Sequence, residues 1–140
     1  MKTTAKQLLF AAPIFFALLI SLSSFAPAAG NPYANGGGIA GDIHFNFNAV
    51  EQKDGSVVGH IQYDGTYYYV ECVEWLSATS AIIYASTSAS QDAFMVTDGG
   101  EGSNAAPDQI SSPVTWTVCD NLDATAFTLA NVSAGNIQIK

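Results

Sequence analysis

The chain has 140 residues, of which 49% are hydrophobic, and its formal net charge at pH 7 is −8. From residue 29 onward it carries two lysines, twelve acidic residues and no arginine, so two minus twelve gives a net charge of −10. This balance argues against nucleic acids and anionic membranes as partners, because both are bound through Lys and Arg. The length after residue 28 suits a single domain.

The first 28 residues have the pattern of a secretory signal peptide. Lys2 and Lys6 precede an apolar run over residues 8–25, and a small-residue cleavage motif follows at residues 26–28. We therefore expect a secreted, extracellular or periplasmic protein with no membrane span once the leader is removed. Residues 29–41 are rich in Gly and Asn and are predicted to be a flexible linker. A single β domain is then expected over residues 42–140.

Two alternating runs on either side of Lys-Asp-Gly at residues 53–55 predict a β-hairpin. Apolar and polar residues alternate with the period of two that is typical of a strand with one buried face. A three-residue loop would pair Phe47 with Ile61 and Phe45 with Tyr63. A two-residue turn would place a phenylalanine beside a glutamine, so the apolar match favours the three-residue loop.

The rest of the chain predicts further short strands separated by turn residues. The segment 66–76 has a strong β composition, but neither of its alternating phases is purely apolar, so we expect a bulge or two partly covered faces. More strands are expected at residues 81–87, 93–97, 110–119, 126–132 and 136–140. In the strand at 110–119, Val114, Trp116 and Val118 are expected to point inward. About eight short strands with a turn every 8–12 residues or so predict an all-β fold, an antiparallel β-sandwich or, as the alternative, a closed eight-strand β-barrel.

The two cysteines, Cys72 and Cys119, predict one disulfide bond if the chain is exported. The long loop between them would give roughly 4 kcal/mol of stabilisation in the chain-entropy model. Two buried free thiols are the alternative. The spacing does not favour a metal role for either cysteine.

An acidic, glycine-rich loop over residues 98–109 is a candidate metal site. It contains Asp98, Glu101 and Asp108, and Ca²⁺ takes 6–8 oxygen ligands that such a loop can supply. The spacing does not match an EF-hand. A solvated acidic loop without a metal is the alternative.

Four aromatic residues, Tyr67, Tyr68, Tyr69 and Trp75, form a candidate ligand-binding cluster. Such rings could stack on sugars or anchor a protein partner. The period of two requires that half of them lie in the core. Only Tyr68, or else the pair Tyr67 and Tyr69, would then be free to bind an extracellular protein or glycan.

A small hydrolase is another functional hypothesis. The favoured hairpin register places His44 opposite Asp64, which could orient an imidazole as a general base. His60 lies on the same face, but about 13 Å along the strands and too far to share a metal with His44. The sequence contains no GxSxG, HExxH or phosphate-loop motif, and no catalytic residue is assigned.

Several segments carry a resemblance to a known group of proteins. They are FNFNA at residues 45–49, GHI at 59–61, VTDGGEG at 96–102 with Asp108 following, and GNIQI at 135–139. These segments are similar to a group of uncharacterised bacterial secreted β-domains, the post-COAP-1-like group. The resemblance implies a β fold and an extracellular compartment rather than a reaction.

The leading functional expectation is a non-catalytic extracellular module that binds a partner or has a structural role. A Ca²⁺- or carbohydrate-binding domain and a small secreted hydrolase are the alternatives. No other cofactor is expected.

Overall fold

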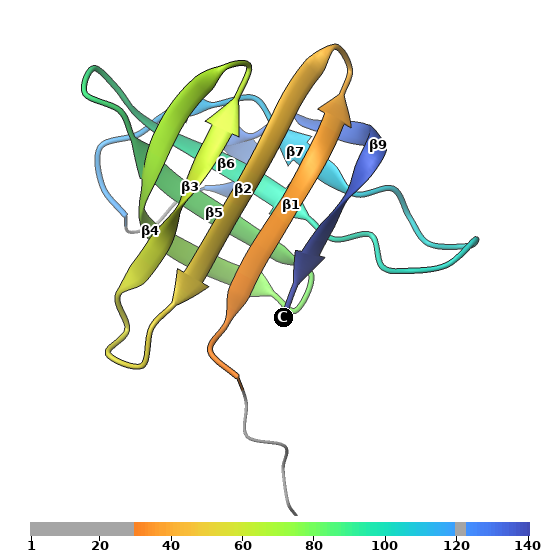
Figure 1. Ribbon diagram of the computed structural model, residues 1–140, viewed down its shortest axis with the longest axis horizontal. Helices are drawn as coiled ribbons and strands as arrows, with labels where there is room; N and C mark the ends of the chain where they lie inside the picture. Colours follow the sequence, from red (N-terminus) through yellow and green to blue (C-terminus); the bar gives the residue numbers. More distant parts are fainter. Residues whose placement is uncertain (1–29, 120–122) are drawn as a thin grey trace, which may run out of the picture.

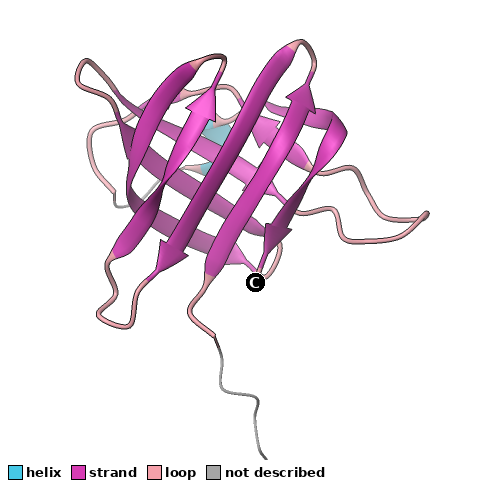
Figure 2. Ribbon diagram, in the orientation of Figure 1, coloured by secondary structure: helices cyan, strands magenta, loops and turns pink. Residues whose placement is uncertain are grey.

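The computed structural model describes residues 30–119 and 123–140, so the predicted signal peptide lies outside the described residues. The described part consists of β-strands, loops and one 3-10 turn (Figure 2). The elements are β1 (Tyr33–Ala40), β2 (Ile43–Glu51), β3 (Val57–Tyr63), β4 (Thr66–Ser77), β5 (Ser80–Ser86), β6 (Gln91–Thr97), β7 (Gln109–Ser111), β8 (Val114–Thr115), η1 (Ala124–Ala126) and β9 (Leu129–Ile139).

The strands form a closed antiparallel barrel. Their order is β5-β4-β3-β2-β1-β9-β7-β6, and a further pairing between β5 and β6 closes the sheet. In Figure 1, β1, β2, β3 and β9 lie in front, and β5, β6 and β7 cross behind them. The two-residue β8 pairs with β6 beside the barrel. The all-β prediction is confirmed, and the topology is the closed eight-strand barrel given as the alternative, because the ladder continues around the whole sheet.

The glycine-rich segment predicted to be a linker forms β1 instead. It pairs along its whole length with β2 and, from Ala34 to Ala40, with β9. The linker prediction over residues 29–41 is therefore wrong for residues 33–40, and the barrel begins before residue 42. Close packing explains Gly36, since a Cβ added there would lie 2.8 Å from the backbone oxygen of Asn136.

The predicted β2–β3 hairpin is confirmed with its register. Phe47 lies opposite Ile61, and Phe45 lies opposite Tyr63. The loop is closed by hydrogen bonds between Gln52 and both Ser56 and Gly55. Gly55 has a φ of 82°, the left-handed conformation that glycine adopts at least cost.

The predicted irregularity in the fourth strand is also present. The register between β4 and β5 shifts between Val70 and Cys72, as expected for a bulge. Tyr68 and Val70 therefore face the barrel interior before the bulge, and Val73 and Trp75 pack against the same core after it. The opposite face of β4 is covered near Cys72 by a second apolar cluster.

The barrel interior is packed with side chains, as in other small eight-strand barrels. The phenyl ring of Phe94 is fully buried, with the rings of Tyr68 and Tyr63 at centroid distances of 5.1 and 5.4 Å. Inward alanines such as Ala34, Ala49 and Ala81 make room for these rings. The other buried members of this core are Ala40, Phe45, Phe47, Ile61, Val70, Ile83, Ala85, Val96, Ile110, Ile137 and Ile139.

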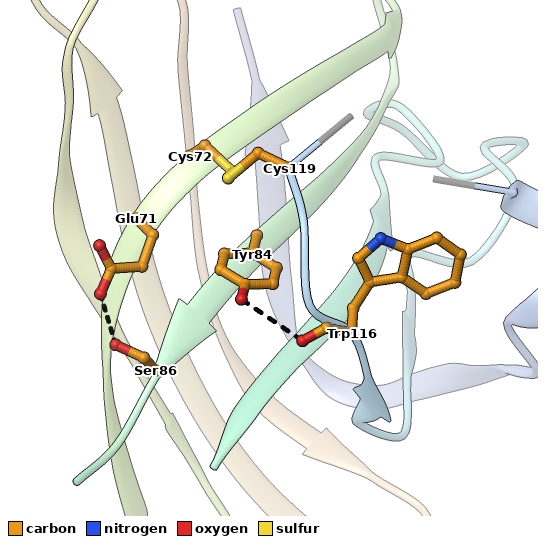
Figure 3. The surroundings of a disulfide bond; sticks show 6 residues. All are labelled: Glu71, Cys72, Tyr84, Ser86, Trp116 and Cys119. Atoms are coloured by element: carbon orange, nitrogen blue, oxygen red, sulfur yellow. Dashed lines mark hydrogen bonds between the residues drawn. A yellow bond between two sulfur atoms is a disulfide. The ribbon is translucent and has the colours of Figure 1, made fainter. Parts of the chain in front are cut away.

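A smaller apolar cluster lies on the outer side of β5 and β6. Ile82, Tyr84, Ala93 and Phe127 are its buried members, and Trp116 packs against them. The tyrosine hydroxyl of Tyr84 donates to the backbone oxygen of Trp116 over 3.3 Å (Figure 3). The chain after β8 therefore covers this side of the barrel.

The structure of residues 110–119 differs from the sequence-based prediction. A single alternating strand with Val114, Trp116 and Val118 inward was expected, but only β7 and β8 are extended and paired there. Trp116 packs against the outer cluster rather than in the barrel, and Val118 is 57% exposed. The predicted disulfide is confirmed, and it joins Cys72 on β4 to Cys119 at the end of the cover (Figure 3).

Replacing both cysteines with serine is expected to lower the free energy of unfolding by about 2–4 kcal/mol, because the unfolded chain loses its cross-link. The bond spans a sequence separation of 47 residues. Urea unfolding of the variant and of the wild type measures the difference, and reduction of the wild type should cause a similar loss. A loss well below about 1 kcal/mol would contradict a stabilising role.

Candidate functional site

The outer surface of β9, β1, β2, β3 and β4 carries a polar face. Inward apolar residues alternate along these strands with outward polar ones, and the pairings align the outward residues in two rows. The first row is Asn136, Gly37, Asn46, Gln62 and Tyr67, and the second row is Gln138, Asn35, Asn48, His60 and Tyr69. We call these ten residues the amide face, since six of them carry side-chain amides.

Hydrogen bonds hold several of these amides in place. The Asn46 amide donates to the Gln62 side-chain oxygen over 2.8 Å. The Asn48 side-chain oxygen accepts the backbone N–H of His60 over 3.0 Å. Each amide has two donor hydrogens and a carbonyl oxygen, so these bonds leave further donors and acceptors directed to solvent. The face can therefore form hydrogen bonds with groups that both donate and accept.

Three rings stand together at one end of the two rows and form an aromatic platform. The His60 imidazole stacks on Tyr67 with a centroid distance of 5.3 Å and an interplanar angle of 9°. Tyr69 meets Tyr67 edge-on at 5.1 Å. Tyr67 is 48% exposed and Tyr69 is 64% exposed, so both rings present apolar surface to solvent. Exposed aromatic rings of this kind are common at binding surfaces.

The four aromatic residues predicted as one cluster do not share a face. Tyr68 is 6% exposed and points into the barrel. Trp75 packs against the core, and its indole N–H donates to Glu51 over 2.7 Å. This leaves the pair Tyr67 and Tyr69 available for a ligand, one of the two arrangements that the period of two allowed.

A shallow depression of about 650 Å³ lies over the first row, on the side of the face nearest the β1–β2 and β3–β4 turns. Its volume is in the range of small-molecule sites, roughly 300–1,000 Å³. Side chains of His44, Asn46 and Gln62 border it, and Gly37 and Gly135 contribute backbone. This depression was not predicted from the sequence, although the outward amides could have been read from the alternation in each strand.

His44 and Asp64 are opposite each other, as the predicted register requires. The backbone N–H of Asp64 donates to the backbone oxygen of His44 over 3.0 Å. Within residues 30–119 and 123–140 no hydrogen bond joins the imidazole to the carboxylate, and both residues are exposed. The oriented pair that a general base needs is therefore not formed in the described structure.

The aspartates of the acidic loop bind the backbone of β9. Asp108 accepts the N–H of Ile137 over 2.5 Å and that of Gly99 over 2.8 Å. Asp98 accepts the N–H of Ile139 over 3.1 Å. β7 pairs with β9 only from Leu129 to Asn131. Further along β9, the carboxylates accept the backbone N–H groups that the carbonyl oxygens of a paired strand would otherwise accept. The barrel is closed at this seam by side chains as well as by backbone.

The predicted third ligand of the loop, Glu101, is exposed and lies 3.5 Å from the amide of Gln138. Among the described residues, no three His, Cys, Asp or Glu side chains are grouped so that they could hold a metal ion. Calcium binding by Asp98, Glu101 and Asp108 stays a prediction, next to the structural role of the two aspartates.

Comparisons with known proteins add no family to this description. No family model matches the chain, no curated protein matches it, and no solved structure matches it. The resemblance to the post-COAP-1-like group therefore stays a prediction. In the part of the chain that the structure describes, no helix has the length and apolar character needed to cross a membrane.

Substituting Asp108 with Asn is expected to lower the free energy of unfolding by roughly 2–3 kcal/mol. An amide keeps only one acceptor oxygen and turns an NH₂ group toward a backbone donor, and hydrogen bonds to charged groups contribute about 1.5–3 kcal/mol. Denaturant unfolding measures the loss, with Glu101→Gln as the exposed control. Calcium binding is tested separately. An upward shift of the unfolding midpoint in millimolar calcium that is absent in Asp108→Asn would support the predicted metal site, and an unmoved midpoint in the wild type would contradict it.

The loss of unfolding free energy at alkaline pH should depend on Tyr68. Burial, followed by the charge of Asp92, raises the pKa of Tyr68 above its ordinary value of 10.0. The folded state then holds the phenol proton more tightly than the unfolded state does. The contribution of Tyr68 to the free energy of unfolding is therefore complete below pH 10 and is lost as the pH rises through the folded pKa.

Tyr68→Phe is therefore expected to flatten the fall in unfolding free energy above about pH 10, and the exposed Tyr69→Phe should not. Unfolding by urea at a series of alkaline pH values checks both variants. An unchanged alkaline slope in Tyr68→Phe would contradict the assignment.

Proposed function

We propose that this chain is a non-catalytic binding module of an exported protein, and that the amide face is its binding surface. The observation that supports this most directly is the pair of outward rows, where hydrogen-bonding amides adjoin the aromatic platform. The barrel interior is filled by the core side chains, so a ligand would bind on the outer surface of the sheet.

Two features support the export of the protein. The Cys72–Cys119 disulfide is typical of proteins from oxidising compartments, the cell exterior or the periplasm. The pattern of residues 1–28 predicts a secretory leader. A partner on the cell envelope, the cell surface or the extracellular matrix fits this location.

Two other features support a binding role rather than a reaction. His44 and Asp64 are both exposed in the described structure, and no side-chain hydrogen bond orients the imidazole. The depression is shallow and open, so it would not shield a reacting group from water as an enzyme site does. Binding by hydrogen bonds and ring stacking needs neither feature.

The proposal predicts that the wild-type protein sediments with washed envelope or matrix material from the cells that produce it. The double variant Asn48→Ala with Tyr69→Ala should sediment about tenfold less, because truncating a central aromatic contact commonly costs 1–2 kcal/mol or more. Thr117→Ala with Thr128→Ala, two exposed positions away from the amide face, is the matched control.

Equal sedimentation of the wild type, the face variant and the control would contradict the proposed surface. If the wild type did not sediment with either material, the binding function itself would be wrong.

A further inference from the structure

We infer that the ligand of the amide face is a neutral polysaccharide, with a sugar unit seated in the depression over Gly37. This inference rests on the proposed binding function and names the class of ligand. Four observations support it: the hydrogen-bonding groups of the amide face, the rings of the aromatic platform, the charge of the chain and the packing around Gly37.

The amides suit a ligand that carries many hydroxyl groups. Each hydroxyl donates one hydrogen bond and accepts up to two, so it pairs with either end of an amide. Asn46 is already bonded through its amino group and Asn48 through its oxygen. β2 therefore presents the carbonyl oxygen of Asn46 and the amino group of Asn48 two residues apart on one face, held in fixed orientations. This pre-organisation lowers the entropy cost of binding a flexible chain.

The aromatic platform supplies the other contact that a sugar ring makes. One face of a pyranose is lined by C–H groups and packs on an aromatic ring, while its hydroxyls point outward to polar partners. Tyr67 ends the first row next to Gln62, and Tyr69 ends the second row next to His60. A chain of sugars lying along either row would thus meet amides over β9 and β2 and a ring over β4.

The charge of the molecule selects among polysaccharides. None of the ten residues of the amide face is Lys or Arg, and the chain as a whole has a net charge of −8. Sulfated and uronic-acid polymers would be repelled, since anionic groups are bound through Lys and Arg. A neutral polymer meets no such barrier.

Gly37 is the residue that packing does not explain. A Cβ added at Gly135 would lie 2.0 Å from the backbone oxygen of Gly37, so the fold requires glycine at position 135. At Gly37 the nearest atoms would lie 3.4 Å away, which is ordinary contact, and its backbone is not in the left-handed region. A glycine inside a strand lowers stability, and it often marks a close approach by a ligand. Its missing side chain keeps the depression open.

The test is the Gly37→Thr variant of the exported protein. Threonine suits a strand, so the thermal midpoint should stay equal or rise, whereas the added side chain fills the depression. Affinity electrophoresis in gels containing dextran, mannan or a soluble β-glucan measures neutral binding, and gels with alginate or hyaluronan measure anionic binding. The wild type should be retarded by at least one neutral polymer and by neither anionic one.

Gly37→Thr is expected to reduce the retardation at least tenfold, measured as the apparent association constant. Val58→Thr is the control, because Val58 is exposed on β3 outside the two rows. Neutral binding that is equal in Gly37→Thr and the wild type would overturn the inference, and so would retardation by the anionic polymers alone.

Envelope binding separates this inference from the proposed function. Mild periodate oxidation, which cleaves the vicinal diols of sugars, should abolish sedimentation of the wild type with the envelope or matrix material. If protease treatment abolishes it and periodate does not, the partner is a protein. The glycan inference then fails while the binding function stands. If the wild type binds neither the untreated material nor any neutral polymer, both proposals fail.

Discussion

The position of β1 between β2 and β9 is the constraint on which the rest of the structure depends. This strand closes the ladder, so the barrel has no long free edge in this region. Closure is possible because the inward residues of the strand, Ala34, Gly36, Gly38 and Ala40, are small. A Cβ at Gly38 would lie 2.0 Å from the backbone oxygen of Ala134, so a larger residue would force β1 and β9 apart. The side chains of Asp98 and Asp108 hold the opposite edge of β9.

Closure also determines where recognition can occur. The small inward residues of β1 leave room for the rings of Phe45 and Phe47, and these fill the interior together with Phe94. A barrel packed in this way offers no internal ligand site, unlike wider barrels that hold a ligand in their lumen. The same strand joins β9 to β2 on the outside, which brings the amides of Asn136 and Asn46 to either side of Gly37. The position of β1 therefore determines both the packing of the core and the arrangement of the amide face.

Local patterns in the sequence were sufficient for part of this fold. The alternation around Phe45 and Phe47, with the turn at residues 53–55, correctly predicted the strands, the loop length and the register of the first hairpin. The irregular phases of residues 66–76 predicted a bulge or two partly covered faces, and a bulge is present. Cys72 and Cys119 correctly predicted a disulfide. Each of these depends on neighbours in sequence or on a pair of cysteines.

The parts that were missed depend on contacts between distant segments. The glycines of β1 have no local strand signal, and their pairing with β9 joins residues about 100 positions apart. The alternation at Trp116 is real, but its apolar side faces the outer cluster rather than the barrel. The amide face needs the registers of four strand pairs at once, so no single segment could reveal it.

Hydrogen–deuterium exchange of the backbone amides of β1 tests the account most directly. A strand paired on both sides is expected to exchange as slowly as β2 and β5, and its amides should open only with the whole barrel. Exchange of residues 35–40 at the rate of an unstructured peptide, while β2 and β5 stay protected, would contradict the closed barrel and the amide face with it.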